Sequence, residues 1–560
     1  MSDSNNKLSG TEHIKMKSDG LRGTLKESLK DELTGALRED DQALIKFHGM
    51  YQQDDRDRRE ERSTKKLEWL YSYMVRLRLP GGFITAEQWE ALHHIAGRHS
   101  TGVIKITTRQ TIQLHGILKG HVKPTLKEFN MAGLDSISAC GDVNRNVICG
   151  AHPKFSSVHE EIFAYAGKLS KLGLPKTKAY YEIWLDEKPL TSPSKEVEEA
   201  DPLYQDRYLP RKFKIAIAIP PNNDVDVFGN DLGLIAIIEN GKLKGFNLAV
   251  GGGMGATHGN PNTYPRLGNV LGFLDSEEKV MKAVYEVITI QRDHGNRSDR
   301  KLSRIKYTID RMGVDNFKKE LEKRCGFELA PEKPYAFTSR SDLFGWHKNH
   351  EGKWYYTVFV EAGRVLDDEK VAFKTAFLEV AQTRKTTFRF TCNQNLILAD
   401  IEDKDKEEID AILRKYDIIN HTEKAGALRK DSIACVAYNT CSLALAEAQR
   451  YLPDLITKME PMLTKHGLED DNISVRMTGC PNGCGRPYVA EIAFIGTSYG
   501  HYNLLLGGDR VGTRLNSIYK ESLNEAALLQ ELDSLLGVYS KERKQNETFG
   551  DFALRAKWVN

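Results

Sequence analysis

An internal repeat constrains the fold of this chain more than any other feature of its sequence. The segment from Tyr356 to Leu366 resembles the segment that starts at Tyr73. In the same way, Thr387 to Leu396 resembles Val103 to Ile112. The two offsets are 283 and about 284 residues, so the order strand, helix, strand is kept together with its spacing. The repeat predicts an ancient duplication whose halves face each other across a pseudo-twofold axis; chance similarity between two strand pairs is the alternative.

Local signals place strands and helices within and beyond the repeats. Alternating apolar and basic residues predict a strand from Tyr73 to Leu79, and Thr85 is suited to cap the helix that follows. Helices are also predicted from about Ser276 to Gln291 and from about Ala526 to Tyr539. Further strands are expected at Val103–Thr107, Gln110–Leu118, Phe213–Pro220, Leu232–Glu239, Val489–Gly496 and Asn503–Leu506.

Composition excludes several classes of protein. The 560 residues carry 80 Lys and Arg against 78 Asp and Glu, and this net charge of +2 argues against a dedicated nucleic-acid binder. No apolar run reaches the length of about 18 residues that a membrane-spanning helix needs. The polar first ten residues lack an apolar signal core, so secretion is not expected. Eight cysteines are too few for a disulfide scaffold, which favours the reducing cytoplasm.

Residues 1–62 are dominated by charge and end in the run from Gln53 to Arg62. Such a run is typical of a solvated helix face or a mobile arm, and we expect a partly disordered N-terminal arm. Within it, Ala43 to Tyr51 is more apolar and is able to dock on the body of the protein.

Four cysteines form two spaced pairs. Cys435 and Cys441 are separated by five residues, Cys480 and Cys484 by three, with 38 residues between the pairs. Grouped thiolates suit a metal or an iron–sulfur cluster, and the wide first pair argues against structural zinc. The Pro/Gly loop from Cys480 to Gly485 frees backbone N–H groups to point at cluster sulfurs. Four ordinary buried thiols are the alternative, and Cys140, Cys149, Cys325 and Cys392 are interpreted in that way.

Cationic residues recur in strand and turn contexts. They are Arg76, Arg109, Arg145, Arg211, Lys212, Lys214, Arg292, Arg297, Arg300, Lys301, Arg304 and Lys306. Each one alone is better explained as a solvated surface charge. Lys212 and Lys214, however, face the same side of a predicted strand, where two ammonium groups repel each other unless an anion lies between them.

These residues stand in motifs that resemble a known family, the sirohaem-containing assimilatory sulfite and nitrite reductases. The cysteine pairs match within Thr478–Arg486, and the resemblance extends from about residue 40 to the C-terminus. Other matching stretches are Arg76–Gly82, Thr108–Gly116, Asn144–Val147 and Leu209–Lys214. Among the family's members, the bacterial NADPH-dependent sulfite reductases are the most similar in these motifs.

The resemblance implies a sirohaem coupled to a [4Fe–4S] cluster. It implies that Cys435, Cys441, Cys480 and Cys484 are the cluster ligands and that Cys484 also binds the sirohaem iron. Arg76, Arg145, Lys212 and Lys214 match the family's substrate-binding cations. Arg109, Gln113, His115, Arg297 and Lys306 are our candidates for holding the sirohaem carboxylates.

The implied activity is the six-electron reduction of sulfite to sulfide, in sulfur assimilation and cysteine biosynthesis. The implied electron donor is a flavoprotein (alpha) subunit that carries FAD and FMN and oxidises NADPH, with the arm at residues 1–62 as a hypothetical docking element. A sirohaem nitrite reductase is the nearest alternative, but its second lysine position is typically Asn, whereas Lys214 stands here. An electron-transfer or scaffold protein without substrate chemistry is the alternative from another class.

The predicted fold is α+β, with a pseudo-twofold duplication of ferredoxin-like half repeats and two cofactor-binding α/β domains. After the arm at 1–62, residues 63–137 pair with 347–421 as the half repeats. Residues 138–346 form the expected sirohaem and substrate domain, and residues 422–560 the expected [4Fe–4S] and sirohaem domain.

Overall fold

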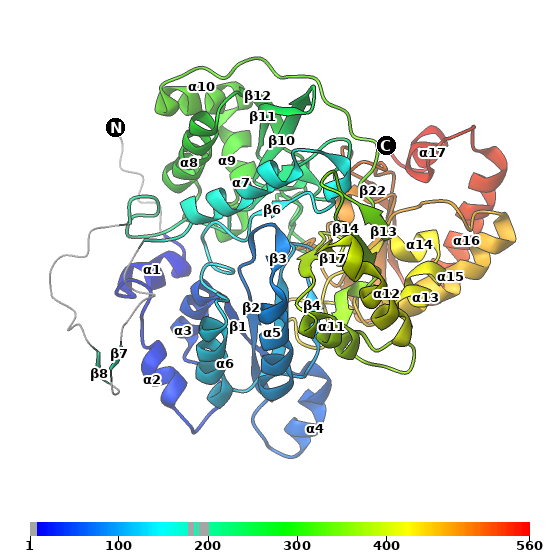
Figure 1. The fold of residues 1–560 in the computed structure, drawn as a ribbon. Helices are drawn as coiled ribbons and strands as arrows, with labels where there is room; N and C mark the ends of the chain where they lie inside the picture. The colour runs from blue at the N-terminus through cyan, green and yellow to red at the C-terminus, as the bar shows by residue number, and fades with distance from the viewer. Residues whose placement is uncertain (1–7, 177–183, 186–187, 190–200) are drawn as a thin grey trace.

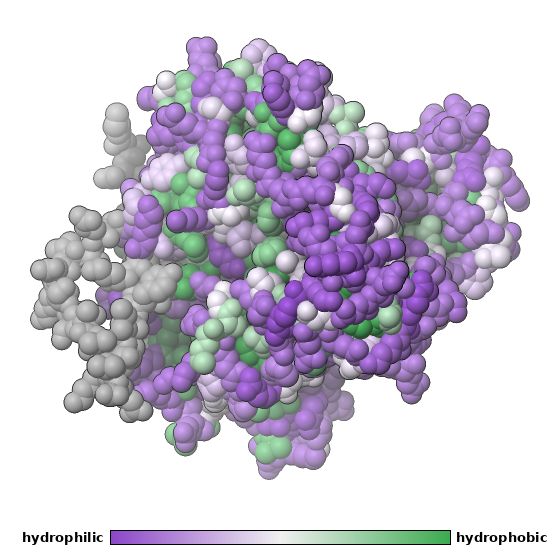
Figure 2. Space-filling view, in the orientation of Figure 1, coloured by the Kyte–Doolittle hydropathy of each residue, from purple (hydrophilic) through white to green (hydrophobic). Residues whose placement is uncertain are grey.

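The computed structural model describes residues 8–176, 184–185, 188–189 and 201–560. In these ranges the chain forms four five-stranded sheets and a short ribbon of β7 (Trp184–Leu185) with β8 (Lys188–Pro189), surrounded by helices (Figure 1). The face shown in Figure 2 is mostly hydrophilic, and its hydrophobic patches are small. None of the helices in these ranges is long and apolar enough to cross a membrane.

The two sequence repeats form two sheets that exchange a strand. One sheet has the order β1 (Met50–Asp54), β2 (Tyr71–Arg76), β5 (Ile112–Ile117), β4 (Ile104–Ile106) and β15 (Arg364–Val365). The other has the order β13 (Gly345–Lys348), β14 (Trp354–Val358), β17 (Leu396–Ile401), β16 (Thr387–Phe390) and β3 (Phe83–Ile84). β15 pairs with β4, and β3 pairs with β16, so each sheet is completed by the other copy. The predicted duplication is confirmed.

The helices of the two copies pack together in one core. They are α5 (Ala86–His99) and α11 (Phe373–Gln382). Thr85 caps α5 as predicted, by accepting a hydrogen bond from the backbone N–H of Gln88. The fully buried ring of Trp89 stacks on Phe388 at 4.7 Å and meets Phe377 edge-on at 5.6 Å between ring centroids. One side chain of the first copy is thus packed against two rings of the second.

We expect Trp89→Ala to destabilise the protein by about 3–5 kcal/mol, because it empties a large space between the copies that the neighbouring rings cannot fill. The urea midpoint of unfolding measures the loss. Trp69→Ala is the matched control, since Trp69 is 42% exposed and its ring contacts Arg59 at 4.1 Å and the partly exposed Tyr71 at 6.3 Å between ring centroids. The control should cost about 1 kcal/mol or less. Equal losses in both variants would contradict the assigned role of Trp89.

The other two sheets form a second related pair that the sequence did not reveal. One has the order β6 (Ile148–Cys149), β9 (Ile215–Ala218), β10 (Leu232–Glu239), β11 (Lys242–Val250) and β12 (Asn269–Leu274). The other has the order β18 (Ser432–Ala434), β19 (Val475–Thr478), β20 (Ile492–Ser498), β21 (His501–Leu506) and β22 (Ser517–Leu523). In both, the first three strands are parallel and the last two antiparallel. The whole architecture is therefore duplicated.

Helices cover these sheets. On the first sheet they are α7 (His159–Leu172), α8 (Glu277–His294), α9 (Ile305–Met312) and α10 (Val314–Cys325); the second has α14 (Ala427–Lys430), α15 (Leu452–His466), α16 (Glu525–Glu542) and α17 (Phe549–Arg555) (Figure 1). The first sheet pair also carries α6 (Lys119–Met131), α12 (Lys406–Lys415) and α13 (Ile418–Lys424). The helices predicted near residues 276–291 and 526–539 are confirmed as α8 and α16.

The expectation of a mobile arm at residues 1–62 is wrong for the part that the structure describes. Residues 8–62 fold into α1 (Gly10–Lys17), α2 (Leu25–Lys30), α3 (Glu39–Leu44), most of α4 (Arg59–Thr64) and β1, the edge strand of the first sheet. Lys15 is buried, and its ammonium group binds Glu12 at 2.5 Å and the Leu209 carbonyl at 2.9 Å. Phe47 packs edge-on against Tyr208. The charge run misled the prediction because these charges find partners inside the protein.

Candidate active site

The two cysteine pairs meet because they follow neighbouring strands. Cys435 comes directly after β18, and Cys480 and Cys484 follow β19. β18 and β19 are parallel, so their carboxyl ends lie at the same edge of the sheet. The backbone N–H of Gly479 donates to Cys435 Sγ at 3.3 Å, and the side-chain amide of Asn482 donates to Cys480 Sγ at 3.4 Å. The loops therefore place hydrogen-bond donors at the sulfur atoms.

The four thiols act on one another electrostatically. Burial, followed by the neighbouring Cys484, raises the pKa of Cys435 well above its usual value and that of Cys480 to about 11. Among the described residues, the only three His, Cys, Asp or Glu groups with ligand atoms within 4.8 Å of one another are His152, Asp224 and Asp342. The cysteine sulfurs are thus more widely spaced than one small ion requires, a spacing that suits a cluster of several iron atoms.

The glycine-rich turn after β11 holds the second cysteine loop. The backbone N–H of Ala256 donates to the Pro481 carbonyl at 2.8 Å. Gly483 has φ +64°, and a Cβ there would lie 2.9 Å from the Met254 carbonyl oxygen. Glycine is required at this position for both its backbone angle and the close approach. The turn thus positions the loop of Cys480 and Cys484.

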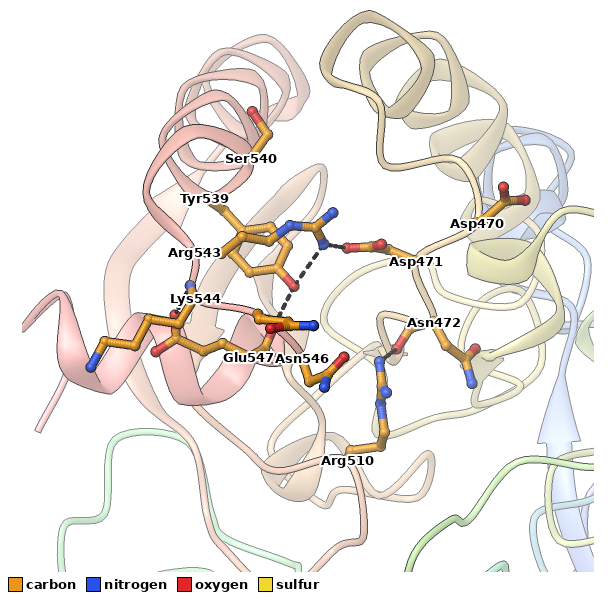
Figure 3. A pocket seen from close by; sticks show the side chains of 11 residues that line it. Asp470, Asp471, Asn472, Arg510, Tyr539, Ser540, Arg543, Lys544, Asn546 and Glu547 are labelled. Carbon is orange, nitrogen blue, oxygen red and sulfur yellow. Dashed lines mark hydrogen bonds and ion pairs between the residues drawn. The ribbon is translucent and has the colours of Figure 1, made fainter.

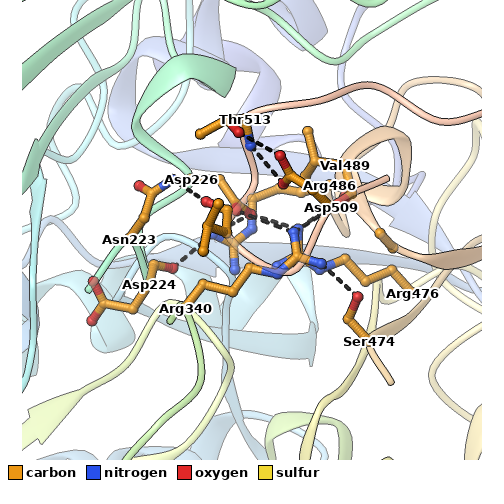
Figure 4. Close-up of polar contacts among 12 residues, drawn as sticks. Asn223, Asp224, Asp226, Arg340, Ser474, Arg476, Arg486, Val489, Asp509 and Thr513 are labelled. Carbon is orange, nitrogen blue, oxygen red and sulfur yellow. Dashed lines mark hydrogen bonds and ion pairs between the residues drawn. The ribbon is translucent and has the colours of Figure 1, made fainter. Parts of the chain in front are cut away.

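A buried ionic cluster fixes the far side of the same loop (Figure 4). Arg486 and Asp226 stand at equivalent places in the two related sheets, each with left-handed backbone before a short helical turn. Arg486 binds Asp226 at 3.0 Å and donates to the Cys392 carbonyl at 2.6 Å. Asp226 also pairs with Arg476 at 2.5 Å and Arg340 at 3.6 Å. This network joins the two α/β domains directly behind the cysteine loop.

Cations gather on the open side of Cys484. The Ala139 carbonyl accepts from Arg145 at 3.2 Å and from Arg76 at 3.5 Å, so both guanidinium groups reach one point. Arg76 Nη1 also donates to Cys140 Sγ at 3.0 Å. The thiol of Cys484 is exposed and close enough to Arg76, Lys212 and Lys214 to act on each of them electrostatically.

The lysines of this group lack a counter-charge. Burial, and then Arg211, lowers the pKa of Lys212 to about 7. Burial, and then Lys212, lowers the pKa of Lys214 well below its usual value. Neither ammonium group donates to an acceptor within the described ranges. Burial therefore favours the neutral amines, and an anion bound against them would stabilise their charged forms.

Two of the predicted sirohaem contacts, Arg109 and Lys306, donate hydrogen bonds to backbone carbonyls. Arg109 donates to the Asn146 carbonyl at 2.5 Å and the Asn230 side chain at 2.8 Å, and burial lowers its pKa to about 9. Lys306 is fully buried and donates to the carbonyls of Gly253 at 3.2 Å, Gly255 at 2.6 Å and Tyr264, so its three N–H groups are engaged, and burial lowers its pKa to about 7. Arg109 Nε has no acceptor in the described chain and suits a cofactor carboxylate, a role that stays a prediction. Lys306 would have to release a carbonyl to bind one, so the structure does not support that part of the prediction.

Arg297 does not belong to this group, contrary to the prediction. Its guanidinium pairs with Glu12 of α1 at 2.6 Å and donates to the Tyr208 carbonyl at 2.7 Å. Its neighbours are paired too, since Arg300 forks onto Asp142 and Arg304 onto Asp231. The sequence suggested that this basic segment is free to bind cofactor carboxylates, because the carboxylates with which it pairs lie far away in the sequence.

Gln113 and His115 are buried beside Arg76, with partners from the protein. The Gln113 amide lies between Arg76 and His115, and the His115 ring also reaches Gln53 and Thr440. No motif in the sequence indicated that the N-terminal segment takes part here. Lys46 also lies among these cations, and burial followed by Arg300 lowers its pKa. The apolar character of Ala43 to Tyr51 was the only available signal.

Arg56 clamps the first cysteine loop from the same N-terminal segment. It donates to the carbonyls of Cys441 at 3.1 Å and Ala444 at 2.8 Å, and to the Tyr438 hydroxyl at 2.8 Å. Sequence reasoning missed this residue, because Arg56 stands inside a charge run with no motif of its own.

A polar cavity of about 560 Å³ lies elsewhere, beside the end of α16 (Figure 3). Both of its arginines are engaged, since Arg543 binds Asp471 and Arg510 donates to the Asn472 carbonyl. No candidate cysteine or cation lines it, so it is not the candidate active site.

Comparisons with known proteins agree with this geometry. The nitrite/sulfite reductase ferredoxin-like half domain matches residues 70–132 and 347–416, the two exchanged copies. The nitrite and sulphite reductase 4Fe-4S domain matches residues 164–329, which form the α/β copy without the paired cysteines. The structure of the NirA protein of Mycobacterium tuberculosis has the same fold, with a TM-score of 0.77 at 22% identity over 98% of this chain and 97% of that one.

Curated relatives match from end to end. "Sulfite reductase [NADPH] hemoprotein beta-component" of Leptospira biflexa is 63% identical over 97% of both chains. The proteins of the same name from Anoxybacillus flavithermus and Bacillus subtilis are 51% and 49% identical, each over 98% of this chain and 95% of its own length. Motifs, fold and full-length similarity together place this chain in the nitrite and sulfite reductase family, alongside the haemoprotein beta-components of NADPH-dependent sulfite reductase.

Proposed function

We propose that this protein reduces sulfite to sulfide with six electrons, as an assimilatory enzyme that supplies sulfide for cysteine biosynthesis. The single observation that carries the proposal is the position of Cys484. Its exposed thiol belongs to the four-cysteine group and also lies within the electrostatic reach of Arg76, Lys212 and Lys214. An electron-delivering centre and an anion-binding group of cations would thus meet at one residue. The names of the curated relatives support the same reaction.

The residues present fit a [4Fe–4S] cluster and a sirohaem. Cys435, Cys441, Cys480 and Cys484 would hold the cluster, and Cys484 would also bind the sirohaem iron. Arg109, whose Nε has no acceptor in the described chain, would bind a sirohaem carboxylate. When bound, the two groups supply electrons to the substrate.

The chain itself binds the anion and supplies protons. Arg76 and Arg145, held at the Ala139 carbonyl, would provide fixed N–H donors, and Lys212 and Lys214 would provide ammonium groups. A pKa of about 7 allows Lys212 Nζ to give a proton to a bound oxygen and to be protonated again from water near neutral pH. Reduction of one hydrogen sulfite to hydrosulfide needs six protons for its six electrons and releases three waters.

A direct experiment tests this function. We expect purified protein to show the visible spectrum of sirohaem, four iron atoms and four acid-labile sulfides for the cluster, and sulfide release from sulfite with reduced methyl viologen. A protein with a cluster but without sirohaem absorption would instead be an electron-transfer protein, and the proposal would be wrong.

We further propose that the electron donor is a flavoprotein (alpha) subunit that carries FAD and FMN and oxidises NADPH, in the cytoplasm. The name "beta-component" of the relatives implies an alpha component. All eight cysteines are free, as expected in a reducing compartment. The N-terminal segment does not fit the hypothetical role of a docking arm, since its described part packs against the rest of the protein.

Lys214→Asn should reduce kcat/KM for sulfite about tenfold to hundredfold, since it removes one charge-assisted hydrogen bond to a substrate that carries up to two negative charges. Nitrite carries one charge and should lose less. Steady-state rates with both substrates and reduced methyl viologen measure the difference.

Sirohaem content is measured in the same samples. If Lys214 held only a cofactor carboxylate, its replacement would lower haem content and both activities together. Lys301→Asn on the exposed surface is the control and should change neither rate. An equal decline for both substrates with intact haem would contradict the matching of charge between Lys214 and sulfite.

A further inference from the structure

A continuous chain of hydrogen bonds leads away from Arg76, one of the cations near Cys484. Arg76 at the end of β2 and Gln113 on β5 are direct cross-strand neighbours. His115 follows Gln113 by two residues and therefore projects from the same face of β5. All of these side chains are largely buried, so each polar atom needs a partner.

The partners fix the orientation of the Gln113 amide. Arg76 has only donors, so the Gln113 oxygen faces its Nη2 at 2.5 Å and its Nε at 2.8 Å. The Gln113 amide nitrogen then donates to His115 Nε2 at 3.1 Å. Because Nε2 accepts, the ring proton of neutral His115 sits on Nδ1. Burial, with Lys105 and Arg76 nearby, lowers the pKa of His115 well below its usual value and keeps the ring neutral.

The Nδ1–H of His115 has two acceptors. One is Gln53 Oε1 on β1 at 2.9 Å, and the other is Thr440 Oγ1 at 3.2 Å. Thr440 directly precedes Cys441, and the loop around it is held by the N-terminal segment, because Asn439 donates to Asp55 at 2.8 Å. The hydrogen-bond chain therefore connects Arg76 with the loop of a candidate cluster ligand.

Both ring nitrogens of His115 are thus engaged with protein atoms, which leaves none for a cofactor carboxylate. Arg76, in contrast, has five N–H groups. Gln113 takes those of Nε and one on Nη2, and Cys140 with Ala139 takes Nη1. The second N–H of Nη2 remains for an anion.

We propose that His115 and Thr440 are positioning residues for anion binding: Thr440 and Gln53 fix the ring of His115, His115 fixes the amide of Gln113, and Gln113 aims the guanidinium of Arg76. This inference rests on the proposed function, because it assigns Arg76 to the sulfite site. It replaces the sequence-based prediction that His115 contacts the sirohaem.

The test uses the dissociation constant of sulfite for the oxidised holoprotein, measured by titration calorimetry, together with sirohaem content. Thr440→Val keeps the shape of the side chain and removes the hydroxyl, and we expect sulfite to bind about threefold to tenfold more weakly, the effect of one neutral hydrogen bond. Thr440→Ser keeps the hydroxyl and should bind as the unchanged protein does. His115→Phe removes both ring nitrogens and should weaken binding by more than Thr440→Val.

A double-mutant cycle separates positioning from general damage. In an Arg76→Lys background the ammonium group cannot make the two bonds to Gln113, so Thr440→Val should have little further effect on the sulfite dissociation constant. Fully additive losses would overturn the inference, as would unchanged binding in Thr440→Val. Loss of sirohaem in His115→Phe with normal sulfite affinity per haem would return His115 to the cofactor site. If the unchanged holoprotein bound no sulfite at all, the proposed function itself would be wrong.

Discussion

Cys480→Ser will abolish sulfite reduction and remove the iron–sulfur cluster. Cys480 is buried with 8% exposure, its sulfur receives a hydrogen bond from Asn482, and its loop is held by the glycine-rich turn and the ionic cluster around Asp226. Cluster binding is coupled to folding, because cysteine ligands are brought together only in the folded chain. We therefore also expect partial unfolding of the domain formed by β18 to α17. Iron and acid-labile sulfide counts, the optical spectrum and limited proteolysis measure these losses.

The matched control is Cys325→Ser, at the end of α10, where a half-buried thiol belongs to neither cysteine pair. It should keep the full cluster and full activity. A complete cluster and normal turnover in Cys480→Ser would remove Cys480 from the set of ligands.

Deleting residues 1–57 will abolish activity even with reduced methyl viologen as the donor. The deletion removes β1, the Gln53 contact to His115 and the clamp of Arg56 on the loop of Cys441. A docking arm would behave differently, since its loss would stop only the reaction driven by NADPH through the partner. The viologen-linked rate of sulfide formation distinguishes these two roles.

A pair of point variants tests the same segment without truncation. Arg56→Ala leaves the carbonyls of Cys441 and Ala444 without their donor, and we expect at least a tenfold loss of viologen-linked activity with a lower cluster content. Arg58→Ala removes an arginine whose side chain is 48% exposed and pairs only with Glu61 in the described chain, so it should be silent. Similar behaviour of the two variants would show that Arg56 is not a clamp.

The parts of the fold that could be predicted from sequence are those with a periodic or spaced signal. The repeat offset predicted the duplication, alternating residues predicted β2, and a continuous apolar run predicted β10, which is buried along most of its length. The cysteine spacing predicted that the two pairs come together, while their place at one sheet edge became clear only from the structure. The two α/β domains were predicted, but their relation to each other was missed, because their functional residues differ, as Cys484 and Asp224 illustrate at equivalent positions.

The errors have a common physical cause. Arg297 and Glu12 are 285 residues apart in the sequence, yet they pair at 2.6 Å. Each was interpreted as an exposed charge, because sequence patterns over neighbouring residues do not reveal a distant ion-pair partner. The same holds for Lys15, whose charge suggested solvent and whose ammonium group is buried against Glu12 and Asp142. A run of charged residues indicates a mobile segment only when no oppositely charged residues from distant parts of the sequence pair with it in the folded protein.

The exchanged strands β3 and β15 have a consequence for synthesis on the ribosome. After β4 has been synthesised, about 260 more residues must be added before its partner β15 exists. At about 5–20 residues per second, this synthesis takes on the order of 10–50 s. During that time the nascent first sheet presents an open edge that is able to pair with other chains. β3 meets β16 only when residues 387–390 emerge. Cells that make this protein must therefore protect a long-lived, half-finished sheet, and a stop codon placed before residue 364 should yield aggregates rather than a folded N-terminal domain.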